Sequence, residues 1–363
     1  MEILEMNYIN FRNLEDRNIR FSPRFNLFFG KNGQGKTSIL EAIYFSATGK
    51  SFRTAKNTEL IKYNKEKMGS YILYRDLISE KSQSVKMDKN KKEYNYNGKK
   101  IIFDEFYGKV NVVTFIPEDI ELITGSPIVR RTFFDGEIAQ SNYDYFKDLK
   151  DYNKILKIRN KYLKEKKNQD ELFSIYEDKF IKLAARLMKK RFEYVKNISI
   201  ILNLNYRKLF DEKKELSLKY ENFLGDLKGL DLNTIEEKVV EKIAHYRKQE
   251  LKYGFSMIGP QKDDFKFILN SKEAKSYSSQ GEKKSIIFSL KLSEIDMVIR
   301  EKRETPIFII DDISSYFDSI RKENIINYLK RRELQVFISS TSNLEIESKD
   351  FEINKGEIQN GAV

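Results

Sequence analysis

The sequence has no cysteine and only one histidine, His245, among its 363 residues. Without cysteine the chain can form neither disulfides nor thiolate metal sites. One histidine leaves no cluster of imidazole ligands for a metal, and at most one Ser/His/Asp triad. Any chemistry must therefore use carboxylates, lysines, hydroxyls and backbone groups.

No stretch of the sequence approaches the roughly 18 consecutive apolar residues that cross a membrane. The first residues include Glu2, Glu5 and Arg12, where a signal peptide would be apolar. We therefore expect a cytoplasmic protein without a membrane span. The length suits a large α/β unit that carries a second lobe.

The balance of charge is strongly basic, with a net charge of +12 and a pI near 9.3. Such a chain is attracted to polyanions. Charge alone does not separate nucleic acid from an anionic membrane surface, so motifs must decide between them.

Residues 30–37 fit the phosphate-loop pattern G-x-x-x-x-G-K-[ST] at every position. An apolar, strand-like run at 25–29 precedes them and a helical pattern follows, which is the order that the motif requires. Glycines let backbone N–H groups approach phosphates, Lys36 reaches the β and γ oxygens, and Thr37 can ligate Mg²⁺. The predicted ATP-binding residues are Gly30, Lys31, Asn32, Gly33, Gln34, Gly35, Lys36 and Thr37.

The four apolar residues 307–310 lead directly into Asp311 and Asp312. A phosphate loop needs a carboxylate on the metal side, and the end of a buried strand supplies one. We expect Asp311 to hold Mg²⁺ and Asp312 to orient the attacking water. The wide separation from Lys36 favours an ATPase with an interrupted nucleotide domain, and the chain has no N-K-x-D segment that would read guanine.

The composition of the chain changes twice along its length. Residues 140–252 are rich in Lys, Glu, Leu and Tyr with helical periodicity, and Gly225 and Gly229 are their only glycines. Residues 1–139 and 253–363 hold short strand-like runs, including a hairpin turn at Asn97-Gly98. The predicted fold is α/β, with an ATPase head of mixed sheet and antiparallel lobe interrupted by a helical insertion lobe at 140–252.

A second glycine turn, Ser278-Ser279-Gln280-Gly281, precedes a helical pattern shortly before Asp311. Taken alone it is an ordinary helix N-cap. In ABC-type proteins such a turn presents its hydroxyl, N–H groups and helix N-terminus to the γ-phosphate held by the opposite subunit. Ser279 and Gly281 are therefore predicted to act across a homodimer.

In their order along nearly the whole chain, these motifs resemble those of the RecF family, DNA-repair members of the ABC ATPases related to the heads of SMC-type proteins. A departure occurs where the family reads G-P-H-R-D-D and this chain reads Gly259-Pro260-Gln261-Lys262-Asp263-Asp264. The resemblance implies a P-loop ABC-type head. The segments that carry it are Asn10-Phe11-Arg12-Asn13, the loop 30–37, Ala47-Thr48-Gly49-Lys50-Ser51, Phe115-Ile116-Pro117-Glu118-Asp119, Gly125-Ser126-Pro127, Arg130-Arg131, the Ser279 turn and Asp311-Asp312.

The resemblance also implies a function. The family roles are those of a weak, DNA-stimulated ATPase that forms an ATP-dependent homodimer on single-stranded or gapped duplex DNA. It would act in recombinational repair, replication recovery and SOS induction, and help to load RecA with RecO and RecR. Catalytic roles fall on Lys36, Asp312 and Ser279. Arg12 would lie near the nucleotide, and Asp318 and Thr341 take the D-loop and switch positions.

Within the predicted insertion, lysines recur at three- and four-residue spacing, so on a helix they form one stripe. Such a stripe binds nucleic-acid phosphates without sequence preference, although a solvated helix face has the same pattern. The candidate DNA contacts are Lys147, Lys150, Lys154, Lys157, Lys161 and Lys164.

Two other functions share the phosphate loop. An ABC-type ATPase could couple to a membrane or another protein partner, which predicts a short insertion and a docking surface. A small-molecule P-loop kinase would work as a monomer and would not need Ser279.

Overall fold

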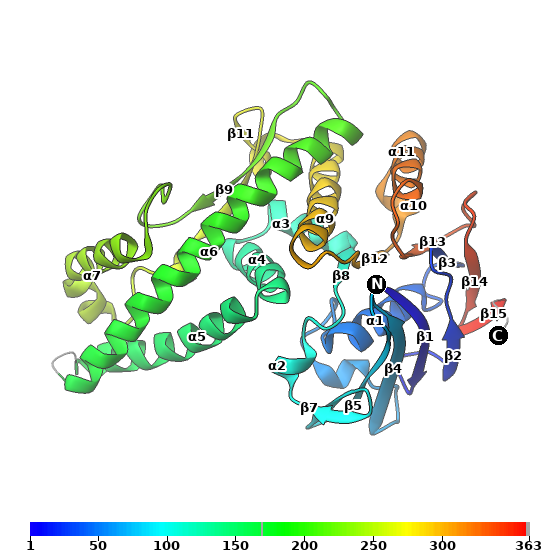
Figure 1. Ribbon diagram of the computed structural model, residues 1–363, viewed down its shortest axis with the longest axis horizontal. Coiled ribbons are helices and arrows are strands. Elements are labelled where there is room, and N and C mark those ends of the chain that lie inside the picture. Colours follow the sequence, from blue (N-terminus) through cyan, green and yellow to red (C-terminus); the bar gives the residue numbers. More distant parts are fainter. Residues whose placement is uncertain (168–169, 361–363) are drawn as a thin grey trace. The chain divides into compact units, whose positions relative to one another are not determined.

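The computed structural model describes residues 1–167 and 170–360, which form two compact units (Figure 1). The first unit comprises Met1–Asp119 and Ile287–Val363, and the second comprises Ile120–Ile286. These boundaries differ from the predicted limits of the insertion, 140 and 252. Residues 253–286 belong to the second unit because β10 (Asp264–Leu269) pairs with β9 (Leu216–Glu221) there.

A mixed six-stranded sheet forms the centre of the first unit. Its strand order is β15-β14-β3-β13-β12-β8, and only the β14–β15 pair is antiparallel. Strands β3, β8, β12 and β13 are short, largely apolar and mostly buried, as is typical of parallel strands, whereas in β14 only Phe351 and Ile353 are buried. Their bounds are β3 Phe25–Phe29, β8 Val112–Phe115, β12 Ile307–Ile310, β13 Val336–Ser340, β14 Lys349–Asn354 and β15 Glu357–Asn360.

The predicted antiparallel lobe is a second six-stranded sheet of the first unit, in the order β2-β1-β4-β5-β6-β7. Helix α1 (Lys36–Thr48) contributes Ile39, Leu40 and Ile43 to one apolar core that both sheets share. The antiparallel strands are β1 Glu2–Ile9, β2 Arg17–Arg20, β4 Lys67–Arg75, β5 Glu80–Asp88, β6 Lys92–Tyr96 and β7 Lys99–Ile101.

Short helical segments complete the first unit. They are η1 Asn57–Leu60, α2 Phe103–Phe106, η2 Pro117–Ile120, α10 Ile313–Tyr316 and α11 Ser319–Lys330. The boundary between the units falls within η2 and also within α9 (Gln280–Lys302), whose residues from Ile287 onward belong to the first unit.

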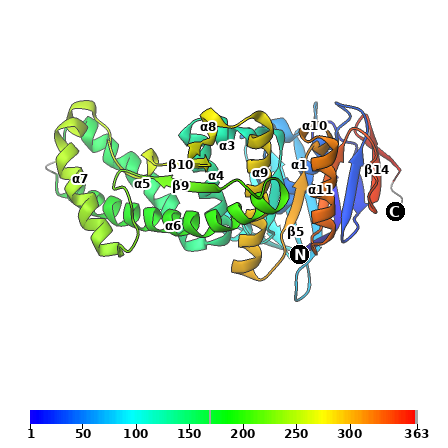
Figure 2. The same ribbon diagram turned by 90° about the horizontal axis from the view of Figure 1, so that it is seen from above.

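Long helices dominate the second unit, where α6 packs along α5 and also against β9 (Figure 2). The sheet order is β11-β10-β9. The sequence pattern predicted only helices between 140 and 252, and the short strand β9 was missed. The remaining elements are α3 Glu121–Thr124, α4 Pro127–Ser141, α5 Tyr143–Lys164, α6 Glu171–Leu209, α7 Leu232–Tyr253, η3 Pro260–Lys262, β11 Lys272–Glu273 and α8 Ala274–Tyr277.

In the described chain, no helix has both the length and the apolar character needed to cross a membrane.

Candidate nucleotide site

The phosphate loop connects β3 to α1 in a conformation that depends on glycine. Gly30 and Gly35 have φ values of 146° and 112°, which side chains with a Cβ rarely adopt. A Cβ at Gly30 would also overlap the carbonyl oxygen of Ile353. Helix α1 then begins at Lys36, so its N-terminal amides face the space enclosed by the loop.

The Lys36 ammonium is held inside the loop by backbone carbonyls. Its Nζ donates to the oxygens of Gly30 at 2.6 Å and Lys31 at 2.9 Å. Burial lowers the pKa of Lys36, and the negative charges of Asp312 and Asp311 oppose this shift. The loop therefore holds a positive charge where it can bind the negatively charged oxygens of a phosphate group.

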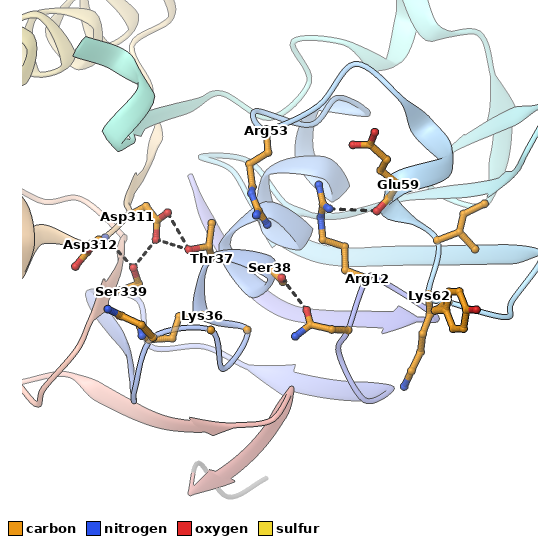
Figure 3. A pocket seen from close by; sticks show the side chains of 16 residues that line it. Arg12, Lys36, Thr37, Ser38, Arg53, Glu59, Lys62, Asp311, Asp312 and Ser339 are labelled. Carbon is orange, nitrogen blue, oxygen red and sulfur yellow. Dashed lines mark hydrogen bonds between the residues drawn. The ribbon is translucent and has the colours of Figure 1, made fainter. Parts of the chain in front are cut away.

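Asp311 lies at the end of β12 and contacts hydroxyls from two other elements (Figure 3). Thr37 Oγ1 lies 3.0 Å from both carboxylate oxygens, and Ser339 Oγ donates to Oδ1 at 2.5 Å. Burial raises the pKa of Asp311, and the hydrogen bonds from Ser339 and Thr37 oppose the rise. The parallel register of β3, β13 and β12 brings the three residues together.

Asp312 has a left-handed backbone, with φ at 54°, which is uncommon outside glycine. Its amide donates to Ser339 Oγ at 2.8 Å, and its Oδ2 accepts from Ser315 Oγ at 2.5 Å. Its Oδ1 is buried and has no hydrogen-bond partner among residues 1–167 and 170–360. A buried acceptor without a partner is costly, so this oxygen suits a water molecule bound in the pocket.

The residues present fit Mg²⁺ held jointly with a nucleotide. Thr37 and Asp311 offer adjacent oxygen ligands, and Mg²⁺ prefers oxygen and usually retains phosphate and water ligands. No group of three or more His, Cys, Asp or Glu side chains able to hold a metal occurs in the described parts of the chain. Phosphate and water oxygens would complete the coordination shell that Thr37 and Asp311 begin.

An open pocket of about 950 Å³ surrounds these groups and extends to Arg12 and Asn13, which lie between β1 and β2. Of the predicted loop residues, Asn32, Gly33, Gly35, Lys36 and Thr37 line it. Asp311, Asp312 and the predicted Arg12 do so too. Gly30 and Lys31 hold Lys36 through their carbonyls, whereas Gln34 faces the C-terminal hairpin.

Two arginines that line the pocket share one buried carboxylate. The Arg12 guanidinium donates to both oxygens of Glu41, and Arg53 Nη1 lies 3.5 Å from Glu41 Oε2. Arg12 Nη1 also donates to the Glu59 carbonyl at 3.2 Å. The cluster keeps a net positive charge beside the pocket, which suits an anionic ligand. The sequence pattern did not indicate Arg53 or Glu41 because neither lies in a phosphate-loop motif.

The C-terminal hairpin β14–β15 supports the phosphate loop from outside. The carbonyl of Gln34 accepts from the Gly356 amide at 2.8 Å, and its Oε1 accepts from the Lys355 amide at 2.7 Å. Gly356 has φ at 84°, and a Cβ there would overlap the carbonyl oxygen of Asn13. Nothing in the sequence connected the turn at Lys355-Gly356 with Gln34.

The predicted signature residues Ser279 and Gly281 belong to the second unit, whereas the residues that line the pocket belong to the first. Ser279 is exposed and forms a capping box at the start of α9. Its amide donates to Glu282 Oε2 at 2.7 Å, and the Glu282 amide donates to its Oγ at 3.2 Å. Lys214 contacts Glu282 Oε1 at 2.7 Å. The hydroxyl thus stands at an exposed helix N-terminus.

Two other positions implied by the resemblance are exposed. Asp318 caps α11, where its Oδ1 accepts from the Arg321 amide at 2.9 Å. Thr341 follows β13 and does not line the pocket. Ser339, which lies two residues earlier in β13, contacts both Asp311 and Asp312.

The six candidate lysines of α5 are all exposed. The buried side of the helix carries Tyr145, Tyr152, Ile155, Arg159 and Leu163, so the lysines form an outward stripe. Lys147 lies over the Tyr143 ring at 4.4 Å, and Lys161 Nζ lies 4.0 Å from Glu165 Oε1. The stripe is available to a polyanion.

The Asp263-Asp264 pair of the departing segment forms ion pairs inside the second unit. Asp263 Oδ2 contacts Arg191 Nη1 at 2.9 Å, and Asp264 Oδ1 contacts Arg130 Nε at 2.7 Å. Burial raises the pKa of Asp263 to about 6. These contacts account for both acids as structural residues.

Comparison with known proteins identifies the relatives of this arrangement. Residues 2–354 match the family model described as the RecF/RecN/SMC N terminal domain. A DNA replication and repair protein RecF of Alkaliphilus oremlandii is 34% identical over 366 residues, covering 99% of this chain and 100% of the relative. The RecF of Streptococcus gordonii is 34% identical over 361 residues, covering 96% and 98%.

Solved structures give the same answer for the fold. A structure of RecF with ATP from the RecFOR pathway has a TM-score of 0.91 at 33% identity, covering 98% of this chain and 96% of that one. An SMC head bound to a domain of ScpA has a TM-score of 0.55 at 14% identity, covering 98% and 94%. The second likeness concerns the fold alone.

Proposed function

The chain belongs to the RecF family of ABC-type ATPases, and from this membership we propose that it is an ATP-dependent DNA-binding protein of DNA replication and repair. The observation that carries the proposal is the convergence of Thr37, Asp311 and Ser339 beside the Lys36 ammonium. This arrangement is suited to a nucleoside triphosphate with its metal. The related RecF was solved with ATP.

In the proposed site, each group has one task. The loop amides and Lys36 bind the phosphates, and Thr37 and Asp311 hold Mg²⁺, which neutralises charge on the phosphate oxygens. Asp312 accepts a hydrogen bond from the attacking water through its free Oδ1 and orients that water toward the γ-phosphate. Arg12 and Arg53 also line the pocket and add positive charge to it.

The proposed active form is a homodimer. Ser279 is exposed at the N-terminus of α9, so its hydroxyl is available to a second copy of the chain. In this form each nucleotide lies between the loop of one copy and Ser279 and Gly281 of the other. ATP then favours the closed dimer, and slow hydrolysis releases it.

The proposed role of the dimer is to hold single-stranded or gapped duplex DNA during recombinational repair, replication recovery and SOS induction. The exposed lysine stripe of α5 supports a sequence-independent grip. We propose that DNA stimulates hydrolysis, and that RecO, RecR and RecA are the partners in RecA loading. We propose that the protein acts in the cytoplasm.

The substitution Ser279→Arg tests the proposal. It should leave ATP binding unchanged but abolish hydrolysis, because a bulky cation at the helix N-terminus blocks the second copy. Ser276→Arg, at an exposed position of the same segment, is the matched control and should keep both activities. Full hydrolysis by the Ser279→Arg variant would contradict a shared site and favour a monomeric phosphotransferase.

A further inference from the structure

A groove in the second unit lies beside strand β9, which has only one strand neighbour in the described chain. One side of β9 pairs with β10, and α6 packs against the strand (Figures 1 and 2). An edge strand presents backbone N–H and C=O groups that need partners. Helix α6 provides partners for part of this edge, and the groove lies beside the part that α6 leaves uncovered.

Helix α6 supplies acceptors to two amides on the outer edge of β9. The Leu216 amide donates to Asn203 Oδ1 and the Leu218 amide donates to Ser199 Oγ, both at 2.9 Å. Since alternate residues of a strand point their amides to the same side, the Tyr220 amide also points outward. One helical turn before Ser199, α6 carries Val195 and Lys196, whose side chains accept no hydrogen bond. Outside the β9–β10 ladder, no backbone carbonyl among residues 1–167 and 170–360 accepts a hydrogen bond from the Tyr220 amide.

The space beside Tyr220 is a groove of about 900 Å³ between α6, β9 and the loop after β9. Its α6 wall includes Phe192, Val195 and Ile200, and Leu218 contributes from β9. Ile200 is 61% exposed and therefore presents apolar surface to the groove. An open strand edge next to apolar walls is the arrangement that binds an extended peptide.

The charge around the groove is positive. Lys196, Lys219 and Lys228 line it, are exposed, and have no ion-pair partner among the described residues. Of the acids that line it, Glu221 is paired with Lys266 at 2.8 Å. Asp226 accepts the Lys228 amide at 2.9 Å. The groove therefore complements a ligand that carries negative charge.

We propose that this groove docks an extended acidic and apolar segment of a partner protein, which adds as a short strand beside Tyr220. Side chains of an added strand alternate between two faces. Those on one face pack against Phe192, Val195 and Ile200, and those on the other meet the lysines. The groove lies wholly in the second unit, and the proposal does not depend on ATP or DNA binding.

A labelled peptide tests the docking site on the full chain. The probe is fluorescein-Gly-Asp-Val-Asp-Ile-Asp-Val-Asp, with a second probe that has lysine at each aspartate. The acidic probe should bind, and the basic probe should not. Ile200→Asp should weaken binding about tenfold or more, because it places a carboxylate against both the apolar residues and the negative ligand. Leu204→Asp is the matched control, since both residues are 61% exposed on α6 but only Ile200 lines the groove.

Hydrogen exchange separates strand addition from loose charge attraction. The acidic probe should slow exchange of the Tyr220 amide, and Lys196→Glu combined with Lys228→Glu should abolish the effect. The proposal fails if the acidic probe does not bind, if Ile200→Asp and Leu204→Asp behave alike, or if the Tyr220 amide is not protected. It also fails if a single-stranded oligonucleotide, and not the peptide, protects that amide.

Discussion

The amide of Gly356 donates a 2.8 Å hydrogen bond to the carbonyl of Gln34, so the C-terminal hairpin braces the phosphate loop. A Cβ at Gly356 would overlap the Asn13 carbonyl, and its φ of 84° disfavours a side chain. We expect Gly356→Ala to displace the hairpin and weaken ATP binding. Equilibrium binding of a fluorescent ATP analogue measures the effect.

The control for that substitution is Gly98→Ala. Gly98 also sits in a hairpin, with φ at 75°, but a Cβ there would meet nothing within 4 Å. Gly98→Ala therefore introduces the backbone strain of a positive φ, about 1 kcal/mol, but no steric overlap. Equal ATP affinities of the two variants would show that the hairpin does not support the loop.

Ser339 links the two acidic residues of the site. Replacing it with alanine removes the donor to Asp311 Oδ1 and the acceptor for the Asp312 amide. A hydrogen bond to a charged group is worth about 1.5–3 kcal/mol, so we expect the Mg²⁺ requirement for hydrolysis to rise about tenfold or more. Ser340→Ala is the control, because Ser340 is equally buried but its hydroxyl contacts Ser314 Oγ. A Mg²⁺ titration of ATPase activity decides between them.

Asp312→Asn should separate binding from hydrolysis. The amide keeps the size of the side chain but removes the charge that orients water, so we expect hydrolysis to fall by about 10²–10⁴-fold. ATP affinity should stay within about threefold of the original, since the phosphates are held by Lys36 and the loop. Asp311→Asn should instead weaken Mg²⁺-dependent binding itself. A loss of ATP affinity in Asp312→Asn would contradict the proposal that Asp312 orients water while Asp311 binds Mg²⁺.

The pH dependence of Mg²⁺ binding follows from the buried position of Asp311. Burial raises its pKa above the ordinary value of 3.8, and Mg²⁺ requires the ionised carboxylate. As the pH falls, the carboxylate is therefore protonated earlier than an exposed aspartate, and Mg²⁺-dependent ATP binding is lost at a higher pH. The measurement is the apparent Mg²⁺ affinity from pH 8 down to about pH 5, with the Mg²⁺ affinity of free ATP subtracted. A profile identical to that of free ATP would contradict the prediction.

The lysine stripe of α5 should control affinity for DNA of any sequence. Lys154→Glu combined with Lys157→Glu should weaken binding to a gapped duplex. It should also reduce the slope of log K against log salt by about 0.9 for each lost phosphate contact. Lys179→Glu combined with Lys182→Glu places the same charge change on exposed positions of α6 and serves as the control. Equal losses would mean that net charge, and not the stripe, governs binding.

The comparisons confirm the ABC-type fold that the motifs predicted, because strand, loop and helix order is a local property of the sequence. Ser339 and Glu41 could not be predicted in the same way. Their contacts with Asp311 and Arg12 depend on strand register and on packing between distant segments. The strand β9 was missed because its short alternating run lies within a charged, helix-like segment, and only pairing with β10 defines it.

We expect ATP to join two copies of the chain, and sedimentation velocity measures this association. With ATP and Mg²⁺, the original protein should sediment as a dimer, and more so when Asp312→Asn prevents hydrolysis. Lys36→Arg should remain a monomer under the same conditions. A protein that stays monomeric while equilibrium binding shows its sites saturated with ATP would contradict the claim.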